Sequence, residues 1–431
     1  MTERQVTGRR LGWLDGLRGF AALVVVCFHL SPSVLGPGRH LAIYRHIDLG
    51  KYGVLLFFLV SGYVIPMSLE RHASLRRFWI GRLFRIYPAY LVTIAVVAVL
   101  GGWRGGVLAH ATMLVDPLGQ RGAVRVFWTL SYEMIFYLVV AGLFACRLHR
   151  RSGWWASGLA LVALLAGSSL PDGLFAGRWT AAVLLILVAG TIAAGLAGLR
   201  RTAGLAGLCF VLLPALNGHP TAKSTVVASW QALLLLAVMF AGTAVYRAQH
   251  AQHAQHAPHA QHAPHAQHAP HAQHAPHAQH AAHARLGLRP AAAPLSVVAI
   301  CLVAAHPNHA LWAANVAAVA ATFALAYRLR HRPIPRVLGF LGRISYSLYL
   351  WHIVVLMVVG AWVPGLAQRA PGERLAVGAA FLVLALGVSW ASYRWVELPG
   401  QRLGRAVVAR FAATERGAAR TGRGENVGAS V

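Results

Sequence analysis

The apolar residues of this chain lie in long blocks, unlike the one-sided stripes that are typical of helices on a soluble protein. A run of about 20 apolar residues is long enough to cross the hydrocarbon core of a bilayer as a helix. The pattern therefore predicts an all-α, polytopic transmembrane helix bundle of about 10–12 spans, two of the blocks being short enough for re-entrant or half-spanning helices (203–216 and 294–306). The twelve blocks are 13–31, 52–69, 87–103, 127–146, 153–170, 178–199, 203–216, 224–246, 294–306, 309–327, 344–361 and 374–396.

The composition supports a membrane protein whose first partner is the lipid bilayer. Only 12% of the 431 residues are charged and 57% are hydrophobic, whereas soluble domains carry roughly 25% charged residues. The net charge of +28 comes from arginines that cluster just outside the apolar blocks, as the positive-inside rule requires of cytoplasmic loops. This distribution argues against a nucleic-acid partner. It predicts a multi-pass protein of the inner (plasma) membrane with both termini in the cytoplasm.

The chain divides into one membrane domain and two other segments. We expect the transmembrane domain over 11–400. It is interrupted at 249–284 by a low-complexity insert of His, Ala, Gln and Pro that holds twelve of the 23 histidines, and the repeated prolines favour a solvated cytoplasmic loop over a continuous helix. The insert is either an expanded repeat in a tolerant loop or a metal-binding or pH-sensing segment. The last segment, 401–431, is predicted to be a disordered basic tail.

Three ionisable side chains lie well inside apolar blocks, where a charge is costly and indicates a functional site by default. They are Glu133, His29 and His352. The four cysteines have no CxxC spacing, so no metal site is expected from them. The bundle therefore holds one carboxylate and two imidazoles as candidates for chemistry.

Arg18 and His29 lie on one face of the first predicted helix. They are eleven residues apart, which corresponds to three turns plus about 20°, or about 16 Å along the axis. Ala21, Ala22 and Val25 lie between them on that face and are small enough to leave a groove or to allow close helix packing. Taken alone, Arg18 fits a boundary anchor and His29 a helix-packing histidine, but their alignment favours a function.

Glu133 and His352 lie on two other blocks. If the helix that carries Glu133 enters the membrane from outside, its carboxylate reaches the depth of His29, and we expect the two side chains to be paired. Tyr349 and His352 form a polar line on a third block. That line alone is also compatible with polar contacts that hold helices together.

Arg82 and Arg85 are one turn apart in the basic and aromatic run RRFWIGRLFRIYPAY (76–90). This spacing suits the binding of phosphate groups by two guanidinium groups. The alternative is an ordinary positive-inside anchor at the membrane boundary.

Four elements, in their order along the chain, resemble the acyltransferase-3 family of transmembrane O-acyltransferases, and the similarity covers about 11–400 apart from the insert. The resemblance implies an enzyme that transfers acyl groups other than amino-acyl groups. Its donor would be a cytoplasmic acyl-CoA, acetyl-CoA by default, and its acceptor a hydroxyl of a cell-envelope glycan or a glycosylated small molecule. The four elements are Arg18 and His29 with ten residues between them, Arg82 and Arg85 in GRLFRIYPAY, WTLSYEMIFY (128–137), and SYSLYLWH (345–352).

The same resemblance suggests a role for each candidate. The three arginines would bind the CoA phosphates, and the pantetheine arm would follow the groove of small residues. His29 would act as general base on the acceptor hydroxyl, oriented by Glu133, although an acyl-histidine intermediate is an alternative. His352 with Tyr349 would polarise the thioester carbonyl.

A different class of function is also compatible with buried ionisable groups. A Glu and His pair inside a bundle can relay protons in a transporter or channel. The chain shows no repeat symmetry between its halves, which many transporters have, and transport gives no reason for arginines that are placed to hold phosphates.

Overall fold

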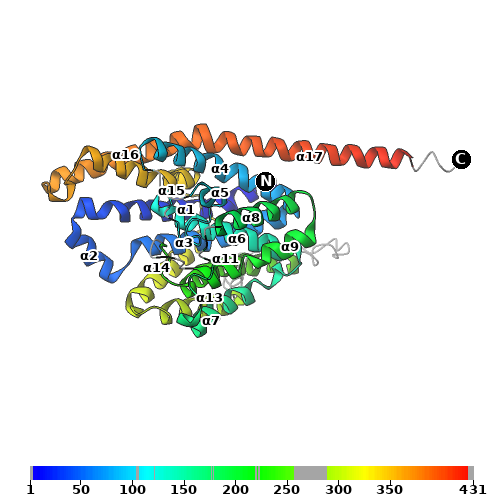
Figure 1. Cartoon of the computed structure of the whole chain (residues 1–431), viewed down its shortest axis with the longest axis horizontal. Coiled ribbons are helices and arrows are strands. Elements are labelled where there is room, and N and C mark those ends of the chain that lie inside the picture. The colour runs from blue at the N-terminus through cyan, green and yellow to red at the C-terminus, as the bar shows by residue number, and fades with distance from the viewer. Residues whose placement is uncertain are drawn as a thin grey trace, which may run out of the picture.

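The computed structural model describes residues 3–425 except 103–105, 121, 176, 178, 219–220, 222–223 and 257–288. Those residues form helices and connecting turns, with no strand among them (Figure 1). The helices are α1 (Glu3–Leu35), α2 (Pro37–His46), α3 (Leu49–His72), α4 (Leu75–Val99), α5 (Val107–Thr112), η1 (Arg125–Phe127), α6 (Trp128–Ala145), η2 (His149–Arg151), α7 (Ser152–Ala166), η3 (Gly167–Ser169), α8 (Thr180–Leu196), α9 (Arg200–Cys209), α10 (Leu212–Asn217), α11 (Ser229–His256), α13 (Arg289–Ala304), α14 (His309–Arg328), α15 (Arg336–Trp362), η5 (Leu366–Gln368), α16 (Pro371–Ser392), the π-helical turn η6 (Tyr393–Glu397) and α17 (Leu398–Glu425).

Eight helical segments in the described part of the chain are long and apolar enough to cross a membrane, and two shorter apolar helices accompany them, Thr180–Leu196 and Pro290–Ala304. The chain is thus a multi-pass membrane protein, with fewer full-length spans than the ten to twelve predicted. The eight segments are Gly12–Leu35, Leu49–His72, Leu75–Val99, Arg125–Ala145, Ser229–His250, His309–Arg328, Arg336–Trp362 and Pro371–Thr414.

The missing spans are apolar blocks that fold as short helices. The block at 153–170 becomes α7, which has 15 residues, and the block at 203–216 is divided between α9 with 10 residues and α10 with 6 residues. A helix rises 1.5 Å per residue, so none of the three reaches across a hydrocarbon core of about 30 Å.

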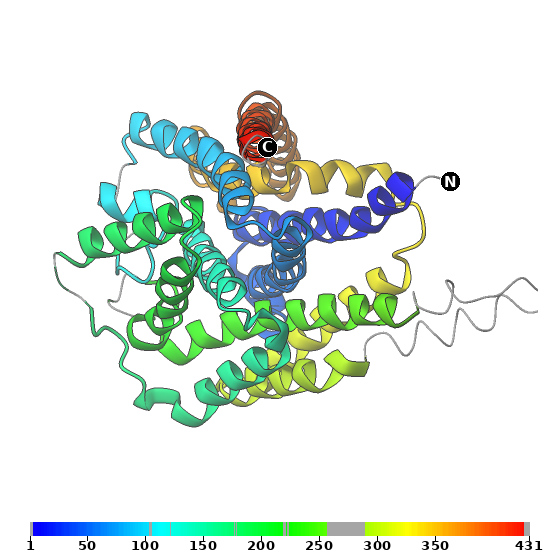
Figure 2. The same cartoon turned by 90° about the vertical axis from the view of Figure 1, so that its right-hand side faces the viewer.

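Two segments that were expected to lack helical structure are helical in part. Residues 401–425 belong to α17, which runs along the edge of the bundle and projects beyond it (Figures 1 and 2). This part of the predicted disordered tail is therefore a helix, in keeping with a sequence rich in Ala and Arg, two strong helix formers. The first residues of the His-rich insert continue α11 as far as His256, and 257–284 of the insert lie outside the described residues, as do 426–431 of the tail.

The centre of the bundle is a row of four helices, α15, α1, α3 and α11, each in contact with the next (Figure 2). Glycines make the contacts close. A Cβ at Gly342 of α15 would overlap the backbone of Asp15 in α1, and a Cβ at Gly53 of α3 would lie 2.7 Å from Val25 of α1. Close packing at small residues is a usual way to associate helices in lipid, and here it brings α15 and α3 against the face of α1 that carries His29.

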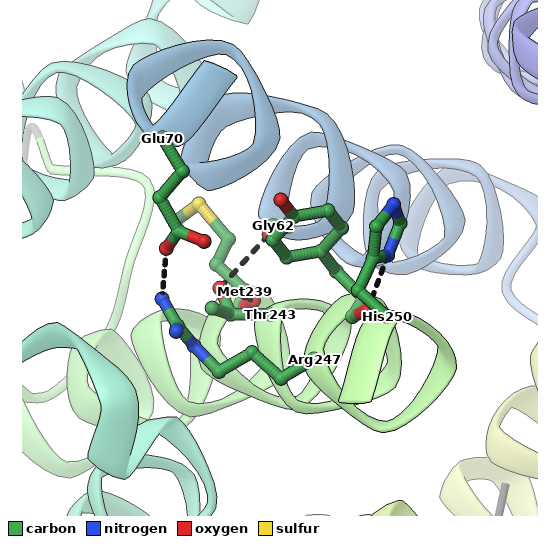
Figure 3. Close-up of polar contacts among 7 residues, drawn as sticks. Gly62, Glu70, Met239, Thr243, Arg247 and His250 are labelled. Atoms are coloured by element: carbon green, nitrogen blue, oxygen red, sulfur yellow. Dashed lines mark hydrogen bonds and ion pairs between the residues drawn. The ribbon is translucent and has the colours of Figure 1, made fainter. Parts of the chain in front are cut away.

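The contact between α3 and α11 is equally close and is reinforced by polar groups (Figure 3). A Cβ at Gly62 would overlap the carbonyl oxygen of Met239, and Thr243 Oγ1 donates a hydrogen bond to the carbonyl of Gly62 at 2.8 Å. Near the C-terminal end of α3, the carboxylate of Glu70 pairs with Arg247 of α11. These contacts hold α3 in place, and α3 carries much of the site described next.

Candidate active site

Two cavities lie end to end along α1, and both are formed by α1, α3, α6 and α15. The first is lined mainly by charged and polar side chains, and α4 also contributes to its wall. The second is almost entirely apolar. We call them the arginine pocket and the apolar pocket.

The arginine pocket brings together the three arginines that the sequence singled out. Arg18 of α1 and Arg82 and Arg85 of α4 all line it, and Arg82 is only 8% exposed. The Arg18 guanidinium lies 5.6 Å from the Phe57 ring centre, and that of Arg82 lies 5.4 Å from the ring centre of Tyr137. Among the described residues, no carboxylate oxygen lies within 4.0 Å of these three guanidinium groups. Cations that line a cavity with no carboxylate within ion-pair distance suit an anionic ligand.

Glu133 lines the arginine pocket as well, which corrects the predicted pairing with His29. Its Oε1 accepts a hydrogen bond from Tyr137 at 2.6 Å and one from Ser61 at 3.4 Å. The ring of His29 contacts different groups, as described below. Glu133 therefore belongs to the group of charges around the three arginines and does not orient His29.

The depth of Glu133 was misjudged because α6 begins inside the bundle. The chain that leads into α6 is already buried, with Val126 and Phe127 at most 3% exposed. The first turn of α6 then packs on α15, where Thr129 Oγ1 donates a hydrogen bond to the Tyr349 hydroxyl at 2.7 Å. Glu133, one turn further on, consequently lies at the level of Arg18.

The apolar pocket is the groove that the small residues of α1 predict. Ala21, Ala22 and Val25 form its α1 wall. Gly53 of α3 and Tyr349 of α15 lie among the residues opposite. The face of α1 between Arg18 and His29 thus borders this cavity from Ala21 to Val25.

His29 and His352 lie together at the far end of this face. Their ring centres are 5.1 Å apart, and Nε2 of His352 lies 3.4 Å from Nδ1 of His29. His352 is fully buried, and its Nδ1 lies 2.9 Å from the carbonyl of Tyr349. His29 is partly exposed, and its Nδ1 lies 2.9 Å from the carbonyl of Val25.

These contacts fix the tautomers of the two neutral rings. A ring nitrogen next to a carbonyl oxygen must carry the hydrogen, so Nδ1 is protonated in both histidines. Nε2 of His352 is then an acceptor that faces His29. Nε2 of His29 has a free lone pair and no hydrogen-bond partner in the described part of the chain. This nitrogen is suited to accept a proton from a substrate.

The hydrogen bonds do not support the role predicted for Tyr349 and His352. A group that polarises a thioester carbonyl must donate a hydrogen bond to it. The Tyr349 hydroxyl already donates to the carbonyl of Val126 at 2.9 Å, and the Nε2 of His352 is an acceptor. In this arrangement Tyr349 lines the apolar pocket, and His352 contacts His29 through its Nε2.

The sequence analysis did not single out the buried carboxylate of Glu397, at the end of η6. It is 2% exposed and accepts hydrogen bonds from Ser347 Oγ and Gln401 Nε2, each at 3.0 Å. Its charge also acts on Arg85 in the arginine pocket. The available signal was the glutamate of VELPGQ (396–401), directly after the last apolar block. It lies in the bundle because the helix continues past that block through η6 into α17.

Aromatic and polar side chains of α2 and its neighbours surround His29 on one side. Phe28 packs on the ring of His40 at 5.4 Å, and His40 stacks on Tyr44 at 6.3 Å. Asp48 lies close to Tyr44, and burial together with this carboxylate raises the pKa of the Tyr44 phenol. Although histidines gather here, no three His, Cys, Asp or Glu side chains within the described ranges are placed to hold a metal ion.

Comparison with known proteins identifies the family. Residues 11–394 match a protein family described as an acyltransferase domain, Acyl_transf_3. The chain belongs to the acyltransferase-3 family. It is therefore an acyltransferase, and the family match covers both cavities and the histidine pair. No solved structure matches the chain.

Several curated proteins are similar to parts of this family member. Acyltransferase MdmB of Streptomyces mycarofaciens is 33% identical over 171 residues, which are 35% of this chain and 44% of that protein. Peptidoglycan O-acetyltransferase OatA of Listeria monocytogenes is 29% identical over 153 residues, 29% of this chain and 23% of its own. O-acetyltransferase OatA of Staphylococcus aureus is 28% identical over 174 residues, 34% of this chain and 27% of its own. The chain thus spans less than half the length of each of these relatives.

Proposed function

We propose that this acyltransferase moves an acyl group, acetyl in the simplest case, from acyl-CoA to a hydroxyl of a carbohydrate-containing acceptor. The observation that carries the proposal is the end-to-end arrangement of the two cavities. One end holds three arginines without a carboxylate within 4.0 Å, and the other ends at Val25, one turn before the imidazole of His29. A donor with phosphates at one end and a thioester at the other fits this arrangement.

The donor would bind with its phosphates in the arginine pocket and its pantetheine arm in the apolar pocket. Guanidinium groups bind phosphate oxygens through paired, charge-assisted hydrogen bonds. Arg18 and His29 lie about 16 Å apart along α1. The apolar pocket lies between them at Ala21, Ala22 and Val25, and its walls suit the mostly uncharged arm. Since CoA is supplied in the cytoplasm, we place the Arg18 end at the cytoplasmic face of the inner (plasma) membrane, with both termini on that side.

His29 would act as the general base. Its Nε2 takes the proton of the acceptor hydroxyl while the hydroxyl oxygen attacks the thioester carbonyl carbon. The tetrahedral intermediate then collapses, the C–S bond breaks, and the imidazolium returns its proton to the CoA thiolate. The products are the acyl ester of the acceptor and CoA, and no further reactant is needed.

The acceptor would approach His29 from the side of α2. Aromatic rings such as Tyr44 and His40 offer the apolar faces on which sugar rings commonly stack, and exposed Arg125 and buried Asp48 add polar groups. The names of two relatives, peptidoglycan O-acetyltransferase and O-acetyltransferase, support a hydroxyl acceptor. We therefore propose a glycan of the cell envelope or a glycosylated small molecule.

The experiment that tests the proposal follows labelled acetyl-CoA in membranes that contain the protein. We expect label to move to the envelope or metabolite fraction, and Arg82→Ala to raise the KM for acetyl-CoA. The loss of hydrogen bonds to a charged group costs about 1.5–3 kcal/mol, or roughly 10- to 150-fold. Arg343→Ala is the matched control, because this arginine is exposed on α15. Absence of any transfer by the unaltered protein, or equal effects of the two variants, would contradict the proposed donor site.

The transporter alternative loses its structural basis. It required Glu133 and His29 to form a proton-relay pair, and the two side chains have different partners. Membership of an acyltransferase family also favours the enzyme.

A further inference from the structure

Phe57 is the residue that the two cavities share. It lines both the arginine pocket and the apolar pocket, and no other described residue lines both. On α3, Ser61 belongs to the arginine pocket one turn on, and Gly53 belongs to the apolar pocket one turn back. The phenyl ring of Phe57 is therefore the partition between the two cavities.

The ring is held from both sides. The Arg18 guanidinium lies 5.6 Å from its centre, which is the geometry of a cation–π contact. The Tyr349 ring stacks on it with centres 6.2 Å apart and an angle of 16° between the planes. Tyr349 is itself fixed by hydrogen bonds to Thr129 and to the carbonyl of Val126. One of the two supports is thus rigid, and the other is a side chain of the proposed phosphate site.

A partition is physically necessary at this place. An open passage from an arginine-lined cavity to a partly exposed histidine would let water and protons cross the bilayer, because a water-filled path removes the barrier that the lipid provides. A donor arm that runs from one cavity to the other must nevertheless pass the same point. The barrier must therefore open for the arm and for little else.

We infer that Phe57 is the specificity-determining barrier between the donor pocket and the acyl-transfer site, and that phosphate binding to Arg18 releases it. An arginine that engages a phosphate gives up its contact with the ring, and the ring can then rotate and let the arm pass. The arm fills the gap while it is bound, so the seal is maintained during the reaction. Displacement of the Phe57 ring by a bound donor rests on the proposed function, whereas closure of the passage by that ring does not.

Proton leak through liposomes that contain the purified protein and a trapped pH-sensitive dye tests the seal. We expect Phe57→Ala to increase the leak several-fold over the unaltered protein, and added CoA to reduce that leak. Phe58→Ala is the matched control, because Phe58 is fully buried and lines the apolar pocket alone. An equal leak from the two variants, no increase for Phe57→Ala, or an unaltered protein that already leaks as much would overturn the inference.

Donor selectivity tests the release by phosphate. Acetyl-pantetheine lacks the phosphates that engage Arg18, so the unaltered protein should use it far less well than acetyl-CoA, as measured by thiol release in membranes. Phe57→Ala should lower the ratio of the thiol-release rate with acetyl-CoA to the rate with acetyl-pantetheine. If this variant does not fold, Phe57→Trp gives the opposite test, with slower use of acetyl-CoA and no added leak. An unchanged ratio in a folded Phe57→Ala protein, or normal turnover in Phe57→Trp, would overturn the role of Phe57. Loss of acetyl-CoA turnover in the unaltered protein would instead refute the proposed function and leave the leak result standing.

Discussion

The contact between His352 and His29 allows their roles to be separated by the size of a mutational effect. We consider His352→Leu, which removes the acceptor nitrogen, and His352→Gln, whose amide oxygen can occupy the position of Nε2. Nδ1 of His29 lies 2.9 Å from the carbonyl of Val25 and 3.4 Å from His352. The carbonyl alone is thus enough to keep the hydrogen on Nδ1, and His352 adds one long, neutral hydrogen bond.

A neutral hydrogen bond contributes about 0.5–1.5 kcal/mol and one to a charged group about 1.5–3 kcal/mol, so this bond strengthens by about 1–1.5 kcal/mol as His29 becomes an imidazolium. Loss of that gain corresponds to a roughly 5- to 13-fold fall in kcat. We therefore expect His352→Leu to lower kcat by a factor in that range, and His352→Gln to have a kcat close to that of the unaltered protein. His29→Gln removes the general base and should cost about 10²- to 10⁴-fold.

The assay is the initial rate of label transfer from acetyl-CoA, divided by the amount of folded protein in the membrane. A loss of a hundredfold or more in His352→Leu, with His29→Gln retaining activity, would show that His352 contacts the reacting atoms. In that case the assignment of the base to His29 would be wrong.

Three further predictions concern the packing of α3 on α11, the binding of phosphate and the dependence of stability on pH. Gly62→Ala should lower the thermal stability markedly and reduce activity, because the added methyl group overlaps the Met239 carbonyl; an unchanged Tm would contradict the close packing of α3 and α11. Arg82→Lys should recover only part of the acetyl-CoA affinity that Arg82→Ala loses, because an ammonium group lacks the planar fork of a guanidinium, and equal affinities for Lys and Arg would refute a paired phosphate contact. Burial lowers the pKa of His306 from 6.5 to about 4, so between these values the unfolded chain binds a proton that the folded chain does not, and stability falls as the pH falls. The full effect is about 3 kcal/mol and is reached below pH 4, and about 2 kcal/mol of it falls between pH 7 and 5. His306→Gln should therefore make the Tm in detergent less dependent on pH between 7 and 5; an unchanged pH dependence would contradict the assignment.

Helical geometry explains which parts of the site could be predicted from the sequence. The shared face of Arg18 and His29 follows from their spacing alone, and the small residues between them indicate a groove. The approach of Arg82 to Arg18, and of His352 to His29, is a tertiary contact that spacing cannot reveal. These contacts were suggested only by the resemblance to a family.

The wrong predictions share a physical cause, which is that local sequence does not determine depth. Glu133 lies beside the arginines because the chain before α6 is buried, and no local pattern in that stretch indicates this. The number of spans was overestimated because the apolar character of a block does not reveal where its helix ends, as α9 and α10 show. Phe57 has an ordinary sequence context, and only the positions of the two cavities identify it.

The most direct test of the central claim is a structure of the protein in a lipid nanodisc with a non-hydrolysable thioether analogue of acetyl-CoA. Our account predicts the phosphates of the analogue in contact with Arg18, Arg82 and Arg85, the arm displacing the ring of Phe57, and the acyl end beside His29. Phosphates bound away from the three arginines, or an acyl end that stays on the arginine side of an unmoved Phe57, would contradict it.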